Sequence, residues 1–272
     1  MEVLKNRRLL AGSLITGFMI LSATLGPLLL KTSAYTININ ERLMGPSALH
    51  WFGTDTLGRD LCARVIHGAG ISLAAAFTVG FITGTLGLLL GLAAGLNRFL
   101  DKILMRICDG VKAIPPVLLA IAMMSLLGAD LWNVILCLSL AYTPNMARLV
   151  RGAALVVREE PYIEAMKALG AGRGRIIFFH IVPNIMSPLI VQLSFVFASS
   201  IITEASLSFL GAGVPVPQPS WGSILSEARG VIYQARWMVI FPGMYTGLAV
   251  LGFNLLGDGL RDLLNPVKSN LS

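Results

Sequence analysis

The charged residues with the most suggestive spacing lie between Glu159 and Gly170. Glu159 and Glu160 precede Pro161, and the dipole of a helix favours negative charge at its N-terminus. Proline suits the first helical turn, and glycine suits the left-handed residue that ends a helix. The pattern predicts a helix of about ten residues from Pro161 to Gly170. A helix this short is marginal in water, so we expect it to dock on another surface.

The residue types of this expected helix favour docking on another surface. Glu164 and Lys167 are expected to be exposed. The residues expected on one broad, alanine-rich apolar face are Ile163, Ala165, Met166 and Leu169. An ordinary connecting helix lying on a membrane surface is the alternative interpretation. The small apolar face favours a shallow groove on a partner protein.

Catalytic and metal-binding patterns are missing from the sequence. There is no G-x-x-x-x-G-K-[ST], H-E-x-x-H or nucleophile elbow, so we expect no ATP hydrolysis by this chain and no enzymatic activity. We also expect no cofactor, no metal site and no disulfide framework, because the cysteines and histidines are too widely spaced. These residues are Cys62, Cys108, Cys137, His50, His67 and His180.

Composition points to a membrane. The chain has 272 residues, of which 55% are hydrophobic and 13% charged, whereas soluble domains carry about 25% charged residues. Six windows lack Asp, Glu, Lys and Arg and approach or exceed the roughly 17–25 residues of a spanning helix. They are Leu9–Leu30, Ala69–Asn97, Ala113–Ala129, Leu131–Ala147, Ile181–Thr203 and Trp237–Gly257. We predict six transmembrane helices and interpret the first as a retained anchor, since it exceeds the ~7–15 apolar residues of a cleavable signal.

The distribution of positive charge sets the expected orientation. With both termini in the cytoplasm, the cytoplasmic segments hold 15 of the 21 Lys and Arg residues, which matches the positive-inside bias. The net charge of +7 is therefore explained by topology and does not call for nucleic acid. We expect an outer polar loop at Lys31–Gly68, a cytoplasmic basic loop at Asn97–Lys112 and an outer loop at Gly211–Arg236.

Glycines recur through the second expected span at a spacing that favours close helix packing. They are Gly80, Gly84, Gly87, Gly91 and Gly95. Near the outer end of the fifth expected span lies Glu204. A carboxylate there could attract a cationic substrate, but we favour a structural role such as capping.

Several motifs together resemble one family, the binding-protein-dependent ABC importer permeases of the dipeptide, oligopeptide and nickel type. The family's E-A-A…G…hydrophobic-Pro pattern has counterparts in Glu164-Ala165-Met166, Gly170 and Val182-Pro183. Further stretches that resemble the family are His50–Asp60, Glu204–Gly211, Pro219–Gly222 and Asn254–Asp262. Departures from the family pattern are Gly70 in place of Arg, Met166 in place of Ala, Val182 in place of Leu and Asn265 in place of Asp.

The resemblance implies roles for named residues. Glu164, Ala165, Met166, Gly170 and Pro183 would couple the permease to an ATPase subunit. Arg173 and Arg175 are possible secondary contacts of that ATPase, or else solvated positive-inside charges. The resemblance places Asp55, Arg59 and Asp60 near a substrate-binding protein, although paired charges between Gly53 and Gly58 favour a local salt-bridged turn.

We therefore predict an all-α, multi-pass protein of the bacterial inner membrane. Residues 1–68 would form an N-terminal anchor helix and outer loop, and residues 69–272 a five-helix permease core. It would be half of the pore of an ATP-driven importer for peptides or nickel/metal chelates, with a slight lean towards nickel from the short N-terminal segment. Expected partners are a homologous second permease, two ATPases, an extracytoplasmic binding protein and lipid. The alternatives are an ion-coupled secondary transporter subunit and a non-transporting membrane scaffold.

Overall fold

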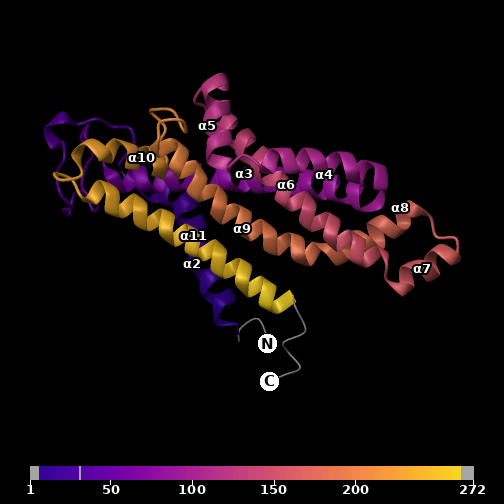
Figure 1. Ribbon diagram of the computed structural model, residues 1–272. Coiled ribbons are helices and arrows are strands. Elements are labelled where there is room, and N and C mark those ends of the chain that lie inside the picture. Colours follow the sequence, from indigo (N-terminus) through magenta and orange to yellow (C-terminus); the bar gives the residue numbers. More distant parts are fainter. Residues whose placement is uncertain (1–5, 31, 265–272) are drawn as a thin grey trace.

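The chain folds into long helices joined by shorter ones, as the sequence predicts (Figure 1). The computed structural model describes residues 6–30 and 32–264. The long helices are α2 (Arg7–Leu29), α3 (Leu61–Leu96), α6 (Leu131–Arg158), α9 (Val182–Phe209) and α11 (Trp237–Leu264). The shorter α-helices are α4 (Arg98–Lys112), α5 (Pro116–Leu127), α7 (Pro161–Ala168), α8 (Arg173–Ile176) and α10 (Trp221–Ala228). Short 3-10 or π turns are η1 (Ile39–Glu41), η2 (Ile177–Ile181) and η3 (Arg229–Val231).

Four helical segments in the described part of the chain are long and apolar enough to cross a membrane. They are α2, α3, the continuous segment Arg173–Phe209 and α11. A fifth is possible if α4 and α5, which meet at a bend of 86°, together make one span. The 12-residue α5 is about 18 Å long, too short to cross a ~30 Å hydrocarbon core alone. The expected count of six spans therefore stays a prediction.

Three expected loops are wholly or partly helical, and Gly211–Arg236 is one of them because it contains α10. Asn97–Lys112, predicted as a basic loop, forms α4, and the Asn97 side chain caps it by accepting hydrogen bonds from the amides of Phe99 and Leu100. Its apolar residues recur at helical spacing, so the sequence carries a signal for this helix besides its charges. The expected loop Lys31–Gly68 ends early, because Asp60 caps a helix that begins at Leu61. The second expected span is thus the last part of a 36-residue helix.

Helix α3 is the central element, and its glycines lie against two different neighbours. A Cβ at Gly80 or Gly84 would meet Phe197 or Leu193 of α9. Further along, a Cβ at Gly91 would lie 2.6 Å from the Ala147 carbonyl oxygen of α6. Gly87 and Gly95 also face α6. The prediction that these glycines permit close helix packing is confirmed.

Apolar side chains fill two cores on either side of α3. One cluster joins α3, α5, α6, α7, α8, α9 and the η2 turn, and includes Val150 and Ile163. The other joins α3 to α2, α9, α10 and α11, and includes Met19 and Trp221. Helix α2 packs along α11, where the backbone approaches so closely at Gly12 and Gly259 that a Cβ would strike the opposite helix. The division of the chain into an N-terminal anchor with its loop, residues 1–68, and a permease core, residues 69–272, stays a prediction.

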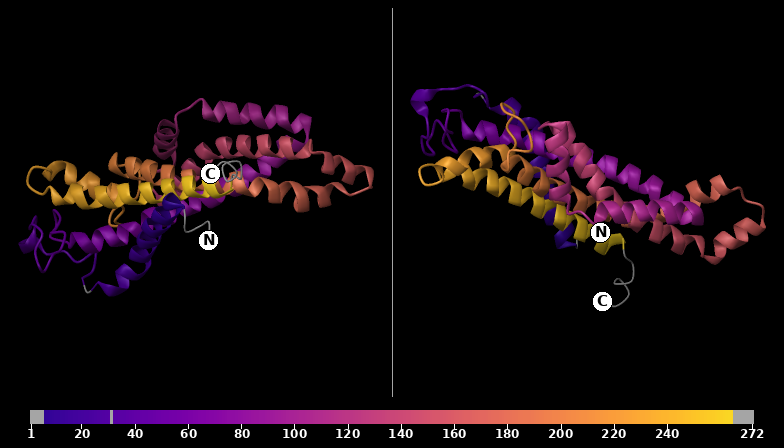
Figure 2. Two further views of the ribbon diagram at one scale, coloured as in Figure 1. Left: turned by 90° about the horizontal axis from the view of Figure 1, so that it is seen from below. Right: turned by 45° about the horizontal axis from the view of Figure 1, so that its top comes forward.

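Different elements lie at the two ends of the molecule (Figure 2). The segment before α3 and helix α10 lie at one end, and α7 and α8 lie at the other. The two groups of residues singled out for contact with partners, Asp55–Asp60 and Glu164–Gly170, are therefore far apart.

We expect Gly91→Ala to destabilise the protein by roughly 1–3 kcal/mol, because the new methyl group meets backbone that must shift. Thermal unfolding of the purified chain in detergent would measure the loss. Gly152→Ala in α6 is the matched control, since a Cβ there meets nothing within 4 Å. An equal effect of both substitutions on the unfolding midpoint would contradict the packing role of Gly91.

Candidate coupling helix and outer ion cluster

Helix α7 begins and ends as the sequence predicts. Pro161 occupies its first turn and Gly170 follows it with φ +83°, a left-handed conformation that suits glycine. The Gly170 amide donates to the Lys167 carbonyl oxygen and the Ala171 amide to that of Met166, each over 3.0 Å. These two bonds form a Schellman motif, which pairs carbonyl groups that the helix end would leave open. The helix has eight residues, slightly fewer than predicted.

The faces of α7 differ from the expected ones. Ile163 is fully buried within the chain's own core, whereas Leu169 is 86% exposed. The prediction that both lie on one docking face is wrong, because six residues along a helix turn the side chain well away from the first. Glu164 and Ala165 are exposed and Met166 is half-buried. Ile163 thus fixes α7 to the protein, and the opposite face is free.

The other residues predicted for coupling lie on neighbouring elements. Pro183 sits in the first turn of α9. Next to it, Asn184 Nδ2 donates to the Tyr162 hydroxyl oxygen of α7 over 3.3 Å. Arg173 and Arg175 belong to α8, and both are exposed. The structure therefore brings Glu164–Gly170 together on one short helix and links that helix to the start of α9.

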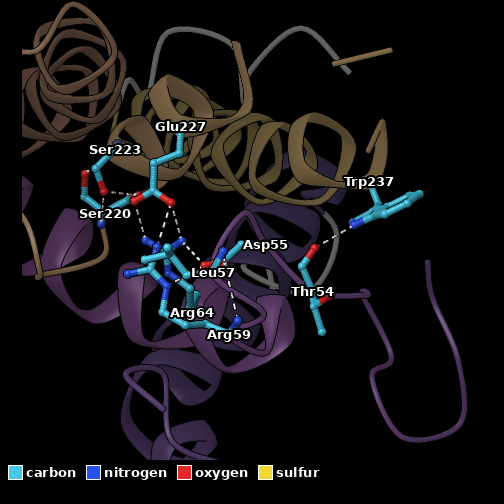
Figure 3. A network of polar contacts seen from close by, with 9 residues as sticks. All are labelled: Thr54, Asp55, Leu57, Arg59, Arg64, Ser220, Ser223, Glu227 and Trp237. Carbon is cyan, nitrogen blue, oxygen red and sulfur yellow. Dashed lines mark hydrogen bonds and ion pairs between the residues drawn. The ribbon is translucent and has the colours of Figure 1, made fainter. Parts of the chain in front are cut away.

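At the opposite end, Asp55 and Arg59 belong to a buried ion cluster (Figure 3). Asp55 Oδ2 accepts from Arg59 Nε over 2.6 Å and from Arg64 Nη1. Glu227 of α10 accepts from Arg59 Nη2 and from both terminal nitrogens of Arg64, over 2.6–2.8 Å. The Asp55, Arg59 and Arg64 side chains are at most 5% exposed. Two carboxylates and two guanidinium groups thus balance in charge and join the segment before α3 to α10.

Asp60 acts beside this cluster as a helix cap. Its Oδ1 accepts from the Ala63 amide over 2.8 Å at the start of α3, and its Oδ2 lies 2.8 Å from His50 Nδ1. The salt-bridged turn that the sequence suggested is therefore present. Contact of Asp55, Arg59 or Asp60 with a binding protein stays a prediction.

Sequence reasoning missed Arg64 and Glu227. The two lie 163 positions apart in the chain, and both stood in segments expected to be solvated loops. The signal available in the sequence for this ion pair was that charged residues are rare in it. An arginine just inside the start of an apolar helix needs a partner, and the outer loop containing Glu227 offers few carboxylates.

Glu204 has a structural setting. It is 1% exposed, and its two carboxylate oxygens accept from Ser72 Oγ of α3 over 2.9 Å and from Ser208 Oγ over 2.7 Å. Ser208 Oγ in turn accepts from the Val214 amide over 3.0 Å. The carboxylate thereby holds α3, α9 and the following loop together, which supports the structural interpretation over substrate attraction.

Several apolar helices long enough to span a bilayer are the construction of a multi-pass membrane protein. Comparison with known proteins gives the class its family. Residues 84–269 match the family described as "Binding-protein-dependent transport system inner membrane component".

Curated relatives agree with the family match over most of the chain. The dipeptide transport system permease protein DppC of Alkalihalophilus pseudofirmus is 45% identical, covering 97% of this chain and 88% of the relative. The glutathione transport system permease protein GsiD of Pectobacterium atrosepticum is 46% identical, covering 82% of this chain and 74% of the relative. The chain belongs to the binding-protein-dependent transport system inner membrane components and is a permease subunit of an ABC importer.

Solved structures show the same fold. The MetNI methionine ABC transporter in an inward-facing conformation aligns with a TM-score of 0.61 at 22% identity, covering 75% of this chain and 98% of that one. Membership in the family places the protein in an inner membrane. It also implies a partner permease, an ATPase and a substrate-binding protein in general.

We expect Asp55→Ala to destabilise the protein by roughly 3–5 kcal/mol, because it leaves buried guanidinium groups without part of their countercharge. Asp109→Ala is the control, since Asp109 pairs with Arg148 at a site where its side chain is 60% exposed and such pairs contribute about 0–1 kcal/mol. Thermal unfolding in detergent would compare the two variants. Similar small losses would show that the cluster is not energetically important.

Proposed function

We propose that this permease forms half of the translocation pore of an ATP-driven peptide importer and receives the motion of an ATPase through α7. The observation that carries the proposal is the position of α7. It is fixed to the chain through Ile163, exposed through Ala165 and Leu169, and joined by short connections to α6 and to the helical segment that begins at Arg173. A displacement of α7 would therefore reach two long helices at once.

The proposed coupling contact centres on the exposed end of α7. Glu164, Ala165, Met166 and Gly170 would enter a groove of the ATPase, with Pro183 fixing the start of α9 behind them. Arg175, and Arg173 beside it, are candidates for secondary contact. Closure of two ATPases around ATP would favour one position of α7 and so shift the pore between inward- and outward-facing states.

We propose six spans with both termini in the cytoplasm. The bent pair α4–α5 would serve as the third span and α6 as the fourth. With 28 residues, α6 is about 42 Å long, which is enough to cross a bilayer. Its arginines lie in its second half, and two of them pair with α4: Arg151 with Asp101 and Arg148 with Asp109. This pairing reduces the cost of placing them near the membrane boundary.

The outer end would face the binding protein. The ion cluster of Asp55, Arg59, Arg64 and Glu227 holds the outer loop and α10 as one unit, and Asp60 secures the start of α3. These buried side chains would shape the receiving surface, while neighbouring exposed residues make contact. We propose an assembly with one homologous second permease, two ATPase subunits and one extracytoplasmic binding protein.

Peptides are the proposed substrate class. The relatives described above are named for dipeptide and glutathione transport, and both compounds are small peptides. Their names favour peptides over the nickel or metal-chelate alternative. An ion-coupled transporter or a scaffold would have no use for a docking helix of this construction.

We expect Gly170→Asp and Glu164→Lys each to abolish co-purification of the ATPase with the permease while leaving the permease folded. Both positions are exposed, and a Cβ at Gly170 meets nothing within 4 Å, but its φ of +83° strains any other residue, so Glu164→Lys, which has no such strain, tests docking alone. Gly172→Asp is the matched control, because Gly172 is also exposed and open but lies beyond the helix end. Affinity purification of the complex from membranes would measure retained ATPase. Undiminished ATPase association in both variants would refute the coupling assignment.

A further inference from the structure

A cavity of about 680 Å³ lies behind α7, on the side that faces the rest of the chain. Its lining comes from the junction of α3 and α4, the end of α6, and the segment from α7 to η2. The volume falls within the ~300–1,000 Å³ typical of sites for small ligands. In Figure 1 these elements meet at the end of the molecule where α7 and α8 lie.

The charge of the lining is positive. Arg98, Arg158, Lys167 and Arg173 contribute to it, and no Asp or Glu does. Arg158 is partly satisfied, since it donates to the Gly95 carbonyl oxygen over 3.0 Å and lies 3.7 Å from Glu159 Oε1. Among residues 6–30 and 32–264, the other three form no ion pair within 4.0 Å. The cavity therefore offers an anion several cations that the fold does not neutralise.

The same cavity has an apolar side. Half-buried Leu96 and Ile177 line it together with the cations, and Ile163, Ile176 and Ile181, at most 5% exposed, lie beneath them in the core. Leu96 ends α3, and the isoleucines from 176 onwards lie near the start of the segment Arg173–Phe209, which are two of the candidate spans. The cavity thus lies where apolar helix gives way to charged chain. A free phosphate would use only the cations, whereas a lipid would use both kinds of surface.

We propose that this cavity binds an anionic phospholipid. Arg98 and Arg173 contact the phosphate, Lys167 and Arg158 contribute to the positive field, and Leu96 and Ile177 pack against the first part of an acyl chain. Basic pockets between the ends of membrane helices suit anionic headgroups for this reason. The inference uses the proposed topology only to assign the cavity to the cytoplasmic leaflet.

The lipid and the ATPase would occupy different faces of α7. Ile163 and Lys167, one helical turn apart, face the cavity, whereas Leu169 is exposed on another side. A bound lipid would support α7 from behind without covering the docking face. The two arginines of α8 are also separated, since Arg173 lines the cavity and Arg175 is not part of the lining. With lipid bound, Arg175 alone would remain for secondary contact with the ATPase.

Native mass spectrometry of the purified full chain would test the site by titration with phosphatidylglycerol, phosphatidylcholine and inorganic phosphate. We expect phosphatidylglycerol to bind most tightly. The double variant Arg98→Ala/Arg173→Ala should weaken that binding roughly 25-fold, at about fivefold for each cation near the headgroup. The matched control Arg106→Ala/Arg175→Ala removes two exposed arginines from the same two helices but outside the lining. It should bind as the parent does.

Three results would overturn the proposal. They are equal loss in both double variants, equal affinity for the two lipids, and inorganic phosphate displacing phosphatidylglycerol at similar concentration. The unfolding midpoint of each double variant, measured without added lipid, establishes that it is folded. If ATPase association failed to depend on Glu164 and Gly170, the lipid site would still stand, because its binding is measured on the permease alone.

Discussion

The close approach of α3 to α6 and α9 is the constraint on which the rest of the structure depends. In a bilayer, apolar burial does not drive helices together, so contact at short range must hold them. Gly80 and Gly84 of α3 face α9, and Gly87, Gly91 and Gly95 further along face α6, which allows that contact. Both neighbours continue towards α7, one from each side of it. The packing of one helix therefore determines where α7 is held.

The two ends of the molecule are stabilised by different interactions, and their proposed tasks differ accordingly. At the end opposite α7, Arg64 and Glu227 join distant segments through short, part-buried, charge-balanced contacts, and removing Glu227 would leave the buried charge of Arg64 without part of its compensation. At the α7 end, burial of Ile163 and one Tyr162–Asn184 hydrogen bond fix a short helix whose other face is open. One end held together by ion pairs, and a short exposed helix at the other end, suit a pore that is moved from one side.

The sequence predicted local structure well where chemistry is local. Pro161 and Gly170 mark a helix that the structure contains, and the glycine spacing in α3 predicted close packing that the structure confirms. Two features could not be predicted, because they depend on residues that are distant in the chain. Ile163 is buried by other elements, so its helical neighbours alone could not indicate its face. The partnership of Arg64 with Glu227 needed a fold that brings α10 to the start of α3. The helix α4 was missed for another reason, because its charges drew attention away from its helical periodicity.

Photo-crosslinking from position 169 in the assembled importer tests the central claim most directly. Leu169 is 86% exposed at the end of α7, and Phe81, 75% exposed in the middle of α3, is the comparison position. A photoreactive amino acid at position 169 is predicted to crosslink to the ATPase subunit, with a yield that changes when ATP is bound, whereas one at position 81 does not reach that subunit. A crosslinking pattern at position 169 without any ATPase product, in an importer that still transports, would contradict the account.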